Sequence, residues 1–196
     1  VGGDAKLDTA QKKFGTASLE LDGTTDNLTY PTSPDFGFGT TNWAAECFIR
    51  PTSVTGTQYI FDFRTGSATD TAPTVYLNGT ALHFGVGNTS QATGGTLSTG
   101  TWYHVAVARS GGSTKLFLDG TQVGSTYTDT NNYGTTKPVA IGSDYNSAAN
   151  AFAGHIDEVR ISKAAARYTA NFTAPTTALG NDLNPVLLIH FDGTDG

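Results

Sequence analysis

The chain has 196 residues, a formal net charge of −6, and 37% hydrophobic but only 14% charged residues. This length suits one domain, and because Lys and Arg form no cluster that could neutralise a phosphate backbone, the composition argues against nucleic-acid binding. No apolar run approaches the roughly 20 residues of a membrane span, and Cys47 stands alone, which excludes an internal disulfide and a cysteine-based zinc cluster.

Short segments of alternating polarity follow one another along the chain. At 19–22, Leu19 and Leu21 share one face, and a longer segment follows with every second residue apolar: Trp43, Ala45, Cys47 and Ile49. Further strands are predicted at 58–63, 74–78, 81–86, 102–109, 115–119, 138–142, 155–161 and 186–191. Turn-rich clusters separate them, and only 164–168 suggests a short helix. The pattern predicts an all-β fold, an antiparallel sandwich of two sheets.

One six-residue motif occurs four times. It reads LFLDGT at 116–121, and related forms stand at 19–24, 75–80 and 189–194. Asp-Gly or Asn-Gly after an alternating strand is a strong hairpin signal, because both residues tolerate positive φ. The copies at 75–80 and 116–121 lead directly into new strands, so each predicts a hairpin with a two-residue turn.

The stretch GTWYHVAVARSGGSTKLFLDGTQVGST, residues 100–126, closely resembles the central hairpin of laminin G-like domains in the concanavalin A-like lectin/glucanase group. The flanking segments 13–31, 42–51 and 152–169 resemble the early strand pair, a core strand and the closing strand of that group. The resemblance runs in order over roughly residues 10–175. It implies a jelly roll of two antiparallel sheets, one of them concave.

The C-terminal part, ARYTANFTAPT at 166–176 followed by LLIHFDGTDG, is similar to domains of bacteriophage tail and other virion structural proteins. This likeness implies a virion, extracellular setting. In such proteins the second motif usually opens a domain, so the chain is either cut from a tandem array or is one domain, 1–196, with 186–196 pairing as its terminal strand. We prefer the second arrangement, because Leu187, Ile189 and Phe191 need a sheet to bury them. The chain holds no Met, and we expect it to be an internal or processed piece of a longer protein.

The carboxylates give no catalytic pattern. Glucanases of this group carry two Glu and an Asp at alternate positions of one strand, where they can serve as nucleophile and acid. The only glutamates here are Glu20, Glu46 and Glu158, and Asp157 and Glu158 are adjacent, so they are expected to point to opposite faces. His104 shares a face with Trp102 and Ala106 and is expected to be a buried, hydrogen-bonded core residue. The sequence therefore predicts that the protein is not an enzyme.

Two weaker site predictions remain. Asp22, Asp26 and Asn27 fall in one loop, and Asp192 could join them if the terminal strand lies beside the first. Such oxygen ligands suit Ca²⁺, which relatives in the resembled group bind at the sandwich rim, although Asp-rich turns are also routinely solvated. Tyr133 and Tyr145 lie in polar loops with Asn132 and Asp144, a combination that can bind glycans.

Two functions are open. The first is a virion-surface module that adheres to glycans or other host-surface ligands. The second is an architectural module that contacts other virion proteins and takes no small ligand. A fold alone does not decide between them.

Overall fold

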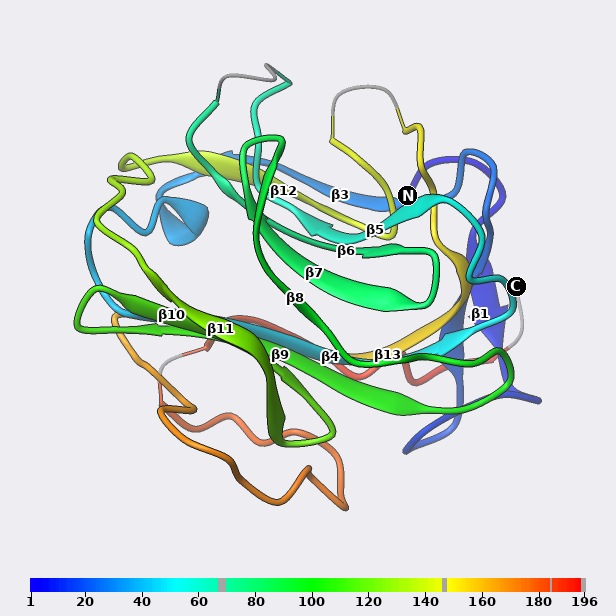
Figure 1. Ribbon diagram of the computed structural model, residues 1–196. Coiled ribbons are helices and arrows are strands. Elements are labelled where there is room, and N and C mark those ends of the chain that lie inside the picture. Colours follow the sequence, from blue (N-terminus) through cyan, green and yellow to red (C-terminus); the bar gives the residue numbers. More distant parts are fainter. Residues whose placement is uncertain (67–69, 146–147, 184, 195–196) are drawn as a thin grey trace.

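Two antiparallel β-sheets stack face to face in the structure, a computed structural model that describes residues 1–66, 70–145, 148–183 and 185–194 (Figure 1). The eight-stranded sheet has the order β1-β2-β13-β4-β9-β10-β11, with β14 also paired to β13. Its strands are β1 (Lys6–Asp8), β2 (Ser18–Asp22), β4 (Trp43–Pro51), β9 (Tyr103–Ser110), β10 (Ser113–Leu118), β11 (Thr121–Thr128), β13 (Ala153–Lys163) and β14 (Pro185–Ile189). The six-stranded sheet has the order β3-β12-β5-β6-β7-β8. Its strands are β3 (Leu28–Ser33), β5 (Thr57–Asp62), β6 (Pro73–Asn78), β7 (Ala81–Val86), β8 (Thr89–Gly94) and β12 (Lys137–Ile141). The predicted all-β antiparallel sandwich is confirmed.

The two predicted hairpins form with two-residue turns, but the turns differ in detail. In β10–β11, Leu118 pairs with Thr121, and both intervening residues have positive φ, Asp119 at 49° and Gly120 at 77°. That is the conformation an Asp-Gly turn favours. In β6–β7, Asn78 pairs with Ala81, so the turn is Gly79–Thr80 and only Gly79 needs positive φ, at 59°. The second turn therefore lies one residue later than the Asn-Gly pair.

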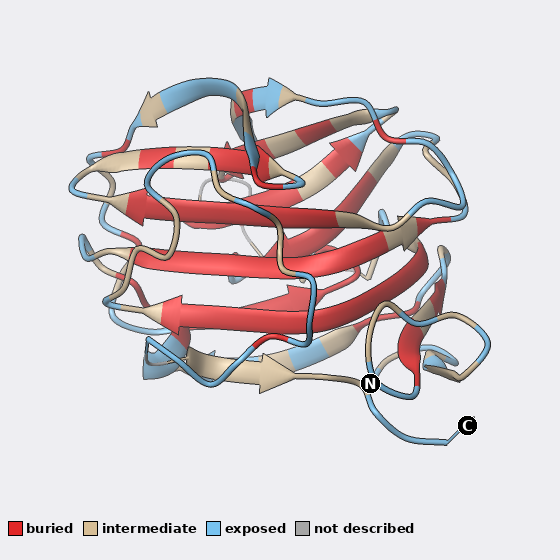
Figure 2. Cartoon of the chain, turned by 90° about the horizontal axis from the view of Figure 1, so that it is seen from below, coloured by how far each residue is buried: buried red, intermediate tan, exposed pale blue. Residues whose placement is uncertain are grey.

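The core lies between the two sheets and follows the alternation of the strands. Trp43, Ala45, Cys47 and Ile49 of β4 are at most 1% exposed, as their shared face predicts. Phe38 stacks on Trp43 with ring centroids 4.8 Å apart and planes 4° apart. Figure 2 shows the buried residues concentrated along the central strands. This burial of apolar surface is the main driving force for the fold.

A long irregular segment, residues 164–183, covers the outer face of the eight-stranded sheet; we call it the covering segment (orange in Figure 1). The prediction of a short helix at 164–168 is wrong, because no helix forms there. Among the described residues, helix is limited to the 3₁₀ turn Pro34–Phe36. Ala164 has φ 61°, outside the right-handed helical region, and Tyr168 and Phe172 both reach the sheet. There they pack on a second cluster of buried residues: Ala44, Ala106, Ala108 and Phe117.

The last strand belongs to the eight-stranded sheet. In β14, Ile189 pairs with Val159 and Leu187 pairs with Ile161 of β13. β2 pairs with the earlier part of β13, from Ala153 to Ile156, so β14 follows β2 along the same edge. No helix in the part of the chain that the structure describes is long and apolar enough to cross a bilayer.

Candidate functional site

A row of three rings crosses the outer face of the six-stranded sheet; we call Tyr59, Tyr76 and His83 the ring row. Tyr76 lies between inward-facing Val75 and Leu77, so the alternation of β6 turns its ring away from the core. Tyr59 on β5 and His83 on β7 flank it as cross-strand partners. The ring centroids are 5.3 Å apart for Tyr59 and Tyr76 and 4.9 Å apart for Tyr76 and His83.

The rings of Tyr76 and His83 stand upright on the sheet, whereas the plane of Tyr59 is tilted by 43° from that of Tyr76. The planes of Tyr76 and His83 differ by only 9°, and their centroid separation matches the spacing of neighbouring strands, so the rings stack along the direction that joins the strands. Both residues are half-buried and present ring edges rather than faces. Nδ1 of His83 lies 2.9 Å from Oγ of Ser90 and 2.8 Å from Oγ1 of Thr93. Burial lowers the pKa of His83, which keeps the imidazole neutral at pH 7.

A charged pair lies at one end of the ring row. The guanidinium of Arg64 is 4.9 Å from the ring centroid of Tyr59 and forms two parallel bonds to Asp62, 2.9 Å from Nε to Oδ1 and 2.6 Å from Nη2 to Oδ2. The backbone N–H of Tyr145 donates to Oδ2 of Asp62 at 3.1 Å. The structure thus brings Tyr145, with Asp144 before it, to this end of the ring row.

The other two predicted glycan residues lie elsewhere. Tyr133 is fully buried in the core, its ring is edge-on to Trp43, and its hydroxyl donates to Asp129 at 2.7 Å. The prediction that Tyr133 binds a glycan is therefore wrong, because this ring offers no face to a sugar. Asn132 is exposed and its Oδ1 accepts the N–H of Gly134 at 2.9 Å. Both residues precede β12 while Tyr145 follows it, a separation of about 13 Å along that strand, so the four predicted residues do not form one site.

An acidic group lies where β1 and β2 meet. Carboxylate oxygens of Asp4, Asp22 and Asp26 lie within 4.8 Å of one another, in a hollow of about 70 Å³ that Lys6 and Glu20 also line. Asp26 is 2% exposed and accepts the N–H groups of Asp4 at 2.8 Å and Asp22 at 2.9 Å. The hydroxyl and N–H of Thr24 hold the pKa of Asp22 below its usual range. Three carboxylates at this spacing can hold a hard cation such as Ca²⁺.

The calcium prediction is met only in part by this geometry. Asp22 and Asp26 come together as expected. Asp4 could not be predicted from the sequence, because it is placed by the neighbouring strand β1, and three residues are too few to show an alternating pattern. Asn27 lies beside the group and donates from its amide to the carbonyl of Thr25 at 3.2 Å.

Asp192 does not reach the acidic group, so that expectation is wrong. Its Oδ1 accepts from N and Oγ1 of Thr16, at 2.5 and 3.2 Å. Thr16 precedes β2, whereas Asp22 ends it, and four residues of that strand span about 13 Å. Asp192 lies far from the acidic group because β14 pairs with β13 beyond the start of β2.

A buried ionic network lies beneath the covering segment. Glu46 is fully buried and its carboxylate is 3.0 Å from Nε2 of His104, 2.8 Å from Nη2 of Arg160 and 2.7 Å from the hydroxyl of Tyr168. Burial alone would raise the pKa of Glu46, but the hydrogen bond and charge of His104, followed by the charge of Arg160, outweigh it and lower the pKa. The prediction of a buried, hydrogen-bonded His104 is confirmed.

Asp157 and Glu158 both point to the outer face, so the expectation of opposite faces is wrong. The strand register shifts between Asp157 and Arg160, and Glu158 has φ 55°, which marks a β-bulge that turns two successive side chains the same way. Asp157 accepts the N–H groups of Lys13 and Phe14, while Glu158 accepts that of Leu179 in the covering segment. Burial raises the pKa of Asp157 to about 6 against these hydrogen bonds. Both carboxylates are buried, so this pair is not presented to solvent.

Among curated protein sequences none matches the chain significantly. In fold it is similar to tailspike protein 2 of Escherichia coli O157:H7 bacteriophage CAB120, at 17% identity and a TM-score of 0.63, over 91% of this chain and 27% of the tailspike. The chain thus spans about a quarter of that protein.

Two further solved structures with this fold were determined with sugars. One is domain 4 of AbnA, a GH43 extracellular arabinanase from Geobacillus stearothermophilus, in complex with arabinotriose; identity is 20%, TM-score 0.61, and coverage 82% of this chain and 75% of that one. The other is the CBM40 of Ruminococcus gnavus IT-sialidase bound to α2,3-sialyllactose, with 14% identity, TM-score 0.59, and coverage of 78% and 91%.

These similarities correct the expectation that the chain is not an enzyme. Structures with the same fold include the enzymatically active domain of a bacteriophage CBA120 tailspike and parts of an arabinanase and of a Trypanosoma rangeli sialidase. At identities of 12–20% these neighbours show the fold alone. A lack of the glucanase carboxylate pattern therefore does not exclude catalysis for a chain with this fold.

The family itself follows from the sequence. Residues 22–167, about three quarters of the chain, match the laminin G-like family model of the concanavalin A-like lectin/glucanases superfamily. The chain belongs to that superfamily.

Proposed function

We propose that the protein is a carbohydrate-binding module and that the ring row is its glycan site. The observation that carries this proposal is a continuous series of aromatic and polar groups across β5, β6 and β7, from Arg64 through Tyr59 and Tyr76 to His83. Sugar hydroxyls bind where aromatic side chains and a few polar groups converge on one surface.

Two groups of the ring row remain available to a ligand. The hydroxyl of Tyr76 and Nε2 of His83 make no hydrogen bond within the described residues, whereas Nδ1 of His83 faces Ser90 and Thr93. A phenol hydroxyl donates and accepts, and the free ring nitrogen of a neutral imidazole does one or the other. Neighbouring sugar hydroxyls need this mixture of donors and acceptors.

The fold neighbours support the same class of ligand, since two of them were solved with arabinotriose and α2,3-sialyllactose. For the setting, we propose an extracellular virion surface. This is supported by the likeness of 166–176 to virion domains and by the fold similarity to a tailspike. Tail-associated proteins that meet a cell surface would use such a module for adhesion.

A glycan array tests the proposal. The wild-type chain should bind a defined subset of glycans, with and without Ca²⁺, and Tyr76→Ala should lose at least about tenfold in affinity because both a ring and a hydroxyl are removed. Tyr103→Ala is the matched control, since Tyr103 is also a half-buried strand tyrosine but lies in the other sheet. An array without hits, or equal losses in the two variants, would count against glycan binding and favour an architectural role among virion proteins.

A further inference from the structure

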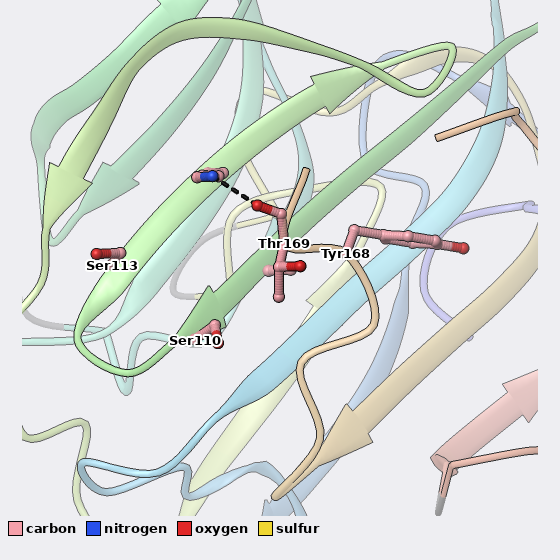
Figure 3. A pocket seen from close by; sticks show the side chains of 6 residues that line it. Ser110, Ser113, Tyr168 and Thr169 are labelled. Atoms are coloured by element: carbon pink, nitrogen blue, oxygen red, sulfur yellow. Dashed lines mark hydrogen bonds between the residues drawn. The ribbon is translucent and has the colours of Figure 1, made fainter. Parts of the chain in front are cut away.

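A pocket of about 190 Å³ lies on the opposite side of the sandwich from the ring row. It opens where the β9–β10 hairpin meets the covering segment, and both apolar and polar side chains line it: Ala108, Ser110, Ser113, Lys115, Tyr168 and Thr169 (Figure 3). A cavity of about 150 Å³ can hold one six-membered ring, so this pocket has room for a single sugar ring. In Figure 3 the ring of Tyr168 extends away from Ser110 and Ser113, and its hydroxyl bonds to Glu46 in the buried network.

The only charged side chain in this lining is a cation. Nζ of Lys115 donates to the carbonyl of Thr169 at 2.6 Å, and no carboxylate pairs with Lys115 within the described residues. An ammonium group has three donors, so two remain for a ligand. In a chain with a net charge of −6, a pocket lined by an unpaired cation and no carboxylate favours an anionic ligand.

The remaining polar groups in the lining are also uncommitted. The hydroxyls of Ser110, Ser113 and Thr169 make no side-chain hydrogen bond among the residues that the structure describes. A hydroxyl can donate to a carboxylate and can also pair with a sugar hydroxyl. The Lys115–Thr169 bond joins the two walls, so the pocket exists before a ligand arrives.

We propose that this pocket binds one acidic sugar unit, with the carboxylate paired to Lys115 and the ring hydroxyls held by Ser110, Ser113 and Thr169. The pocket does not depend on the ring row, because the two lie on the outer faces of different sheets. The two sites together would let the module recognise a neutral and an acidic part of a glycan separately.

An NMR titration with ¹⁵N-labelled full chain tests this assignment. Sodium glucuronate is the probe, glucose is its neutral counterpart, and sodium sulfate controls for inorganic anions. Glucuronate should shift the amides of Ser110, Ser113 and Thr169, and glucose should not. Lys115→Gln should weaken glucuronate binding roughly tenfold or more, because a hydrogen-bonded charge is lost.

Lys12→Gln is the matched control, because Nζ of Lys12 also donates to a backbone carbonyl, that of Thr9 at 2.8 Å, but outside the pocket. That variant should bind glucuronate as the wild type does. The acidic-sugar assignment would be overturned if glucose gave shifts equal to those of glucuronate, or if the glucuronate shifts persisted in Lys115→Gln. It would also be overturned if sodium sulfate gave the same shifts as glucuronate. Shifts confined to Tyr59, Tyr76 and His83 would overturn it while leaving the proposed function in place.

Discussion

Tyr76 and His83 stack across strands β6 and β7, with ring centroids 4.9 Å apart and planes 9° apart. Aromatic pairs on neighbouring strands stabilise a sheet by about 0.5–1 kcal/mol beyond their separate burial. A double-mutant cycle with Tyr76→Ala and His83→Ala, followed by urea unfolding, should therefore give a coupling free energy of that size. Additive effects of the two substitutions would show that the rings do not support each other.

The pKa of Asp157 predicts how stability depends on pH. The folded pKa is about 6 and the unfolded value is near 4, so the folded form binds the extra proton between them. The contribution of Asp157 is thus fully present below pH 4 and is lost as pH rises through 6. Relative to Asp157→Asn, the wild type should lose stability on the order of 1 kcal/mol between pH 4 and 7, allowing for solvent screening.

The pKa of Asp182 shifts in the opposite direction to that of Asp157, so the same unfolding experiment should give the opposite pH dependence. Burial would raise its pKa, but the charges of Arg167 and Arg160 outweigh burial and lower it. The advantage of the wild type over Asp182→Asn should therefore be present above pH 4 and should decline as pH falls through the folded pKa. Matching pH profiles for the two pairs of proteins would contradict at least one of the two assignments.

The covering segment should depend on one hydrogen bond in the buried network. Tyr168→Phe removes the 2.7 Å bond to Glu46 and leaves a buried carboxylate with one donor fewer, which should cost about 1.5–3 kcal/mol in the free energy of unfolding. Tyr103→Phe removes a hydroxyl that accepts from the exposed N–H of Ser98, and it should cost less than about 1 kcal/mol. Equal losses would mean that the network does not secure the segment.

Calcium binding is expected at Asp4, Asp22 and Asp26 rather than at Asp192. Titration of chelator-treated protein with Ca²⁺ should release heat and raise Tm, and Asp22→Asn should remove both effects because one of three carboxylates is lost. Asp192→Asn should retain both effects, since Asp192 lies beside Thr16. A wild type that gives neither heat nor a rise in Tm would end the calcium prediction.

The sequence could predict local features best. The alternation in β4 identified its buried face, and the alternation of the predicted hairpin places Tyr76 and His83 on the same outward face. An Asn78–Gly79 turn would pair Tyr76 with Ala81, whereas the turn one residue later pairs it with His83. The shared face was therefore a signal for the ring row, but the stacked pair was not. Tyr59 could not be added in this way, since its strand is joined to β6 by a long loop and carries a register shift next to it.

Other features depended on contacts between distant segments. Asp4 meets Asp22 only because a three-residue strand pairs with β2, and the covering segment has no periodicity that would show which face it buries. The β-bulge at Glu158 reversed one side-chain direction that strict alternation predicts. Tyr133 lies in a polar stretch of sequence, yet Trp43 and Asp129 hold it inside the core.

The glycan site on the ring row is tested by an NMR titration of the ¹⁵N-labelled chain with the highest-affinity glycan from the array. We expect the largest amide shifts on Tyr59, Tyr76 and His83, and we expect Tyr76→Ala to abolish them. Shifts that leave these three residues unchanged, with affinity preserved in Tyr76→Ala, would contradict this expectation.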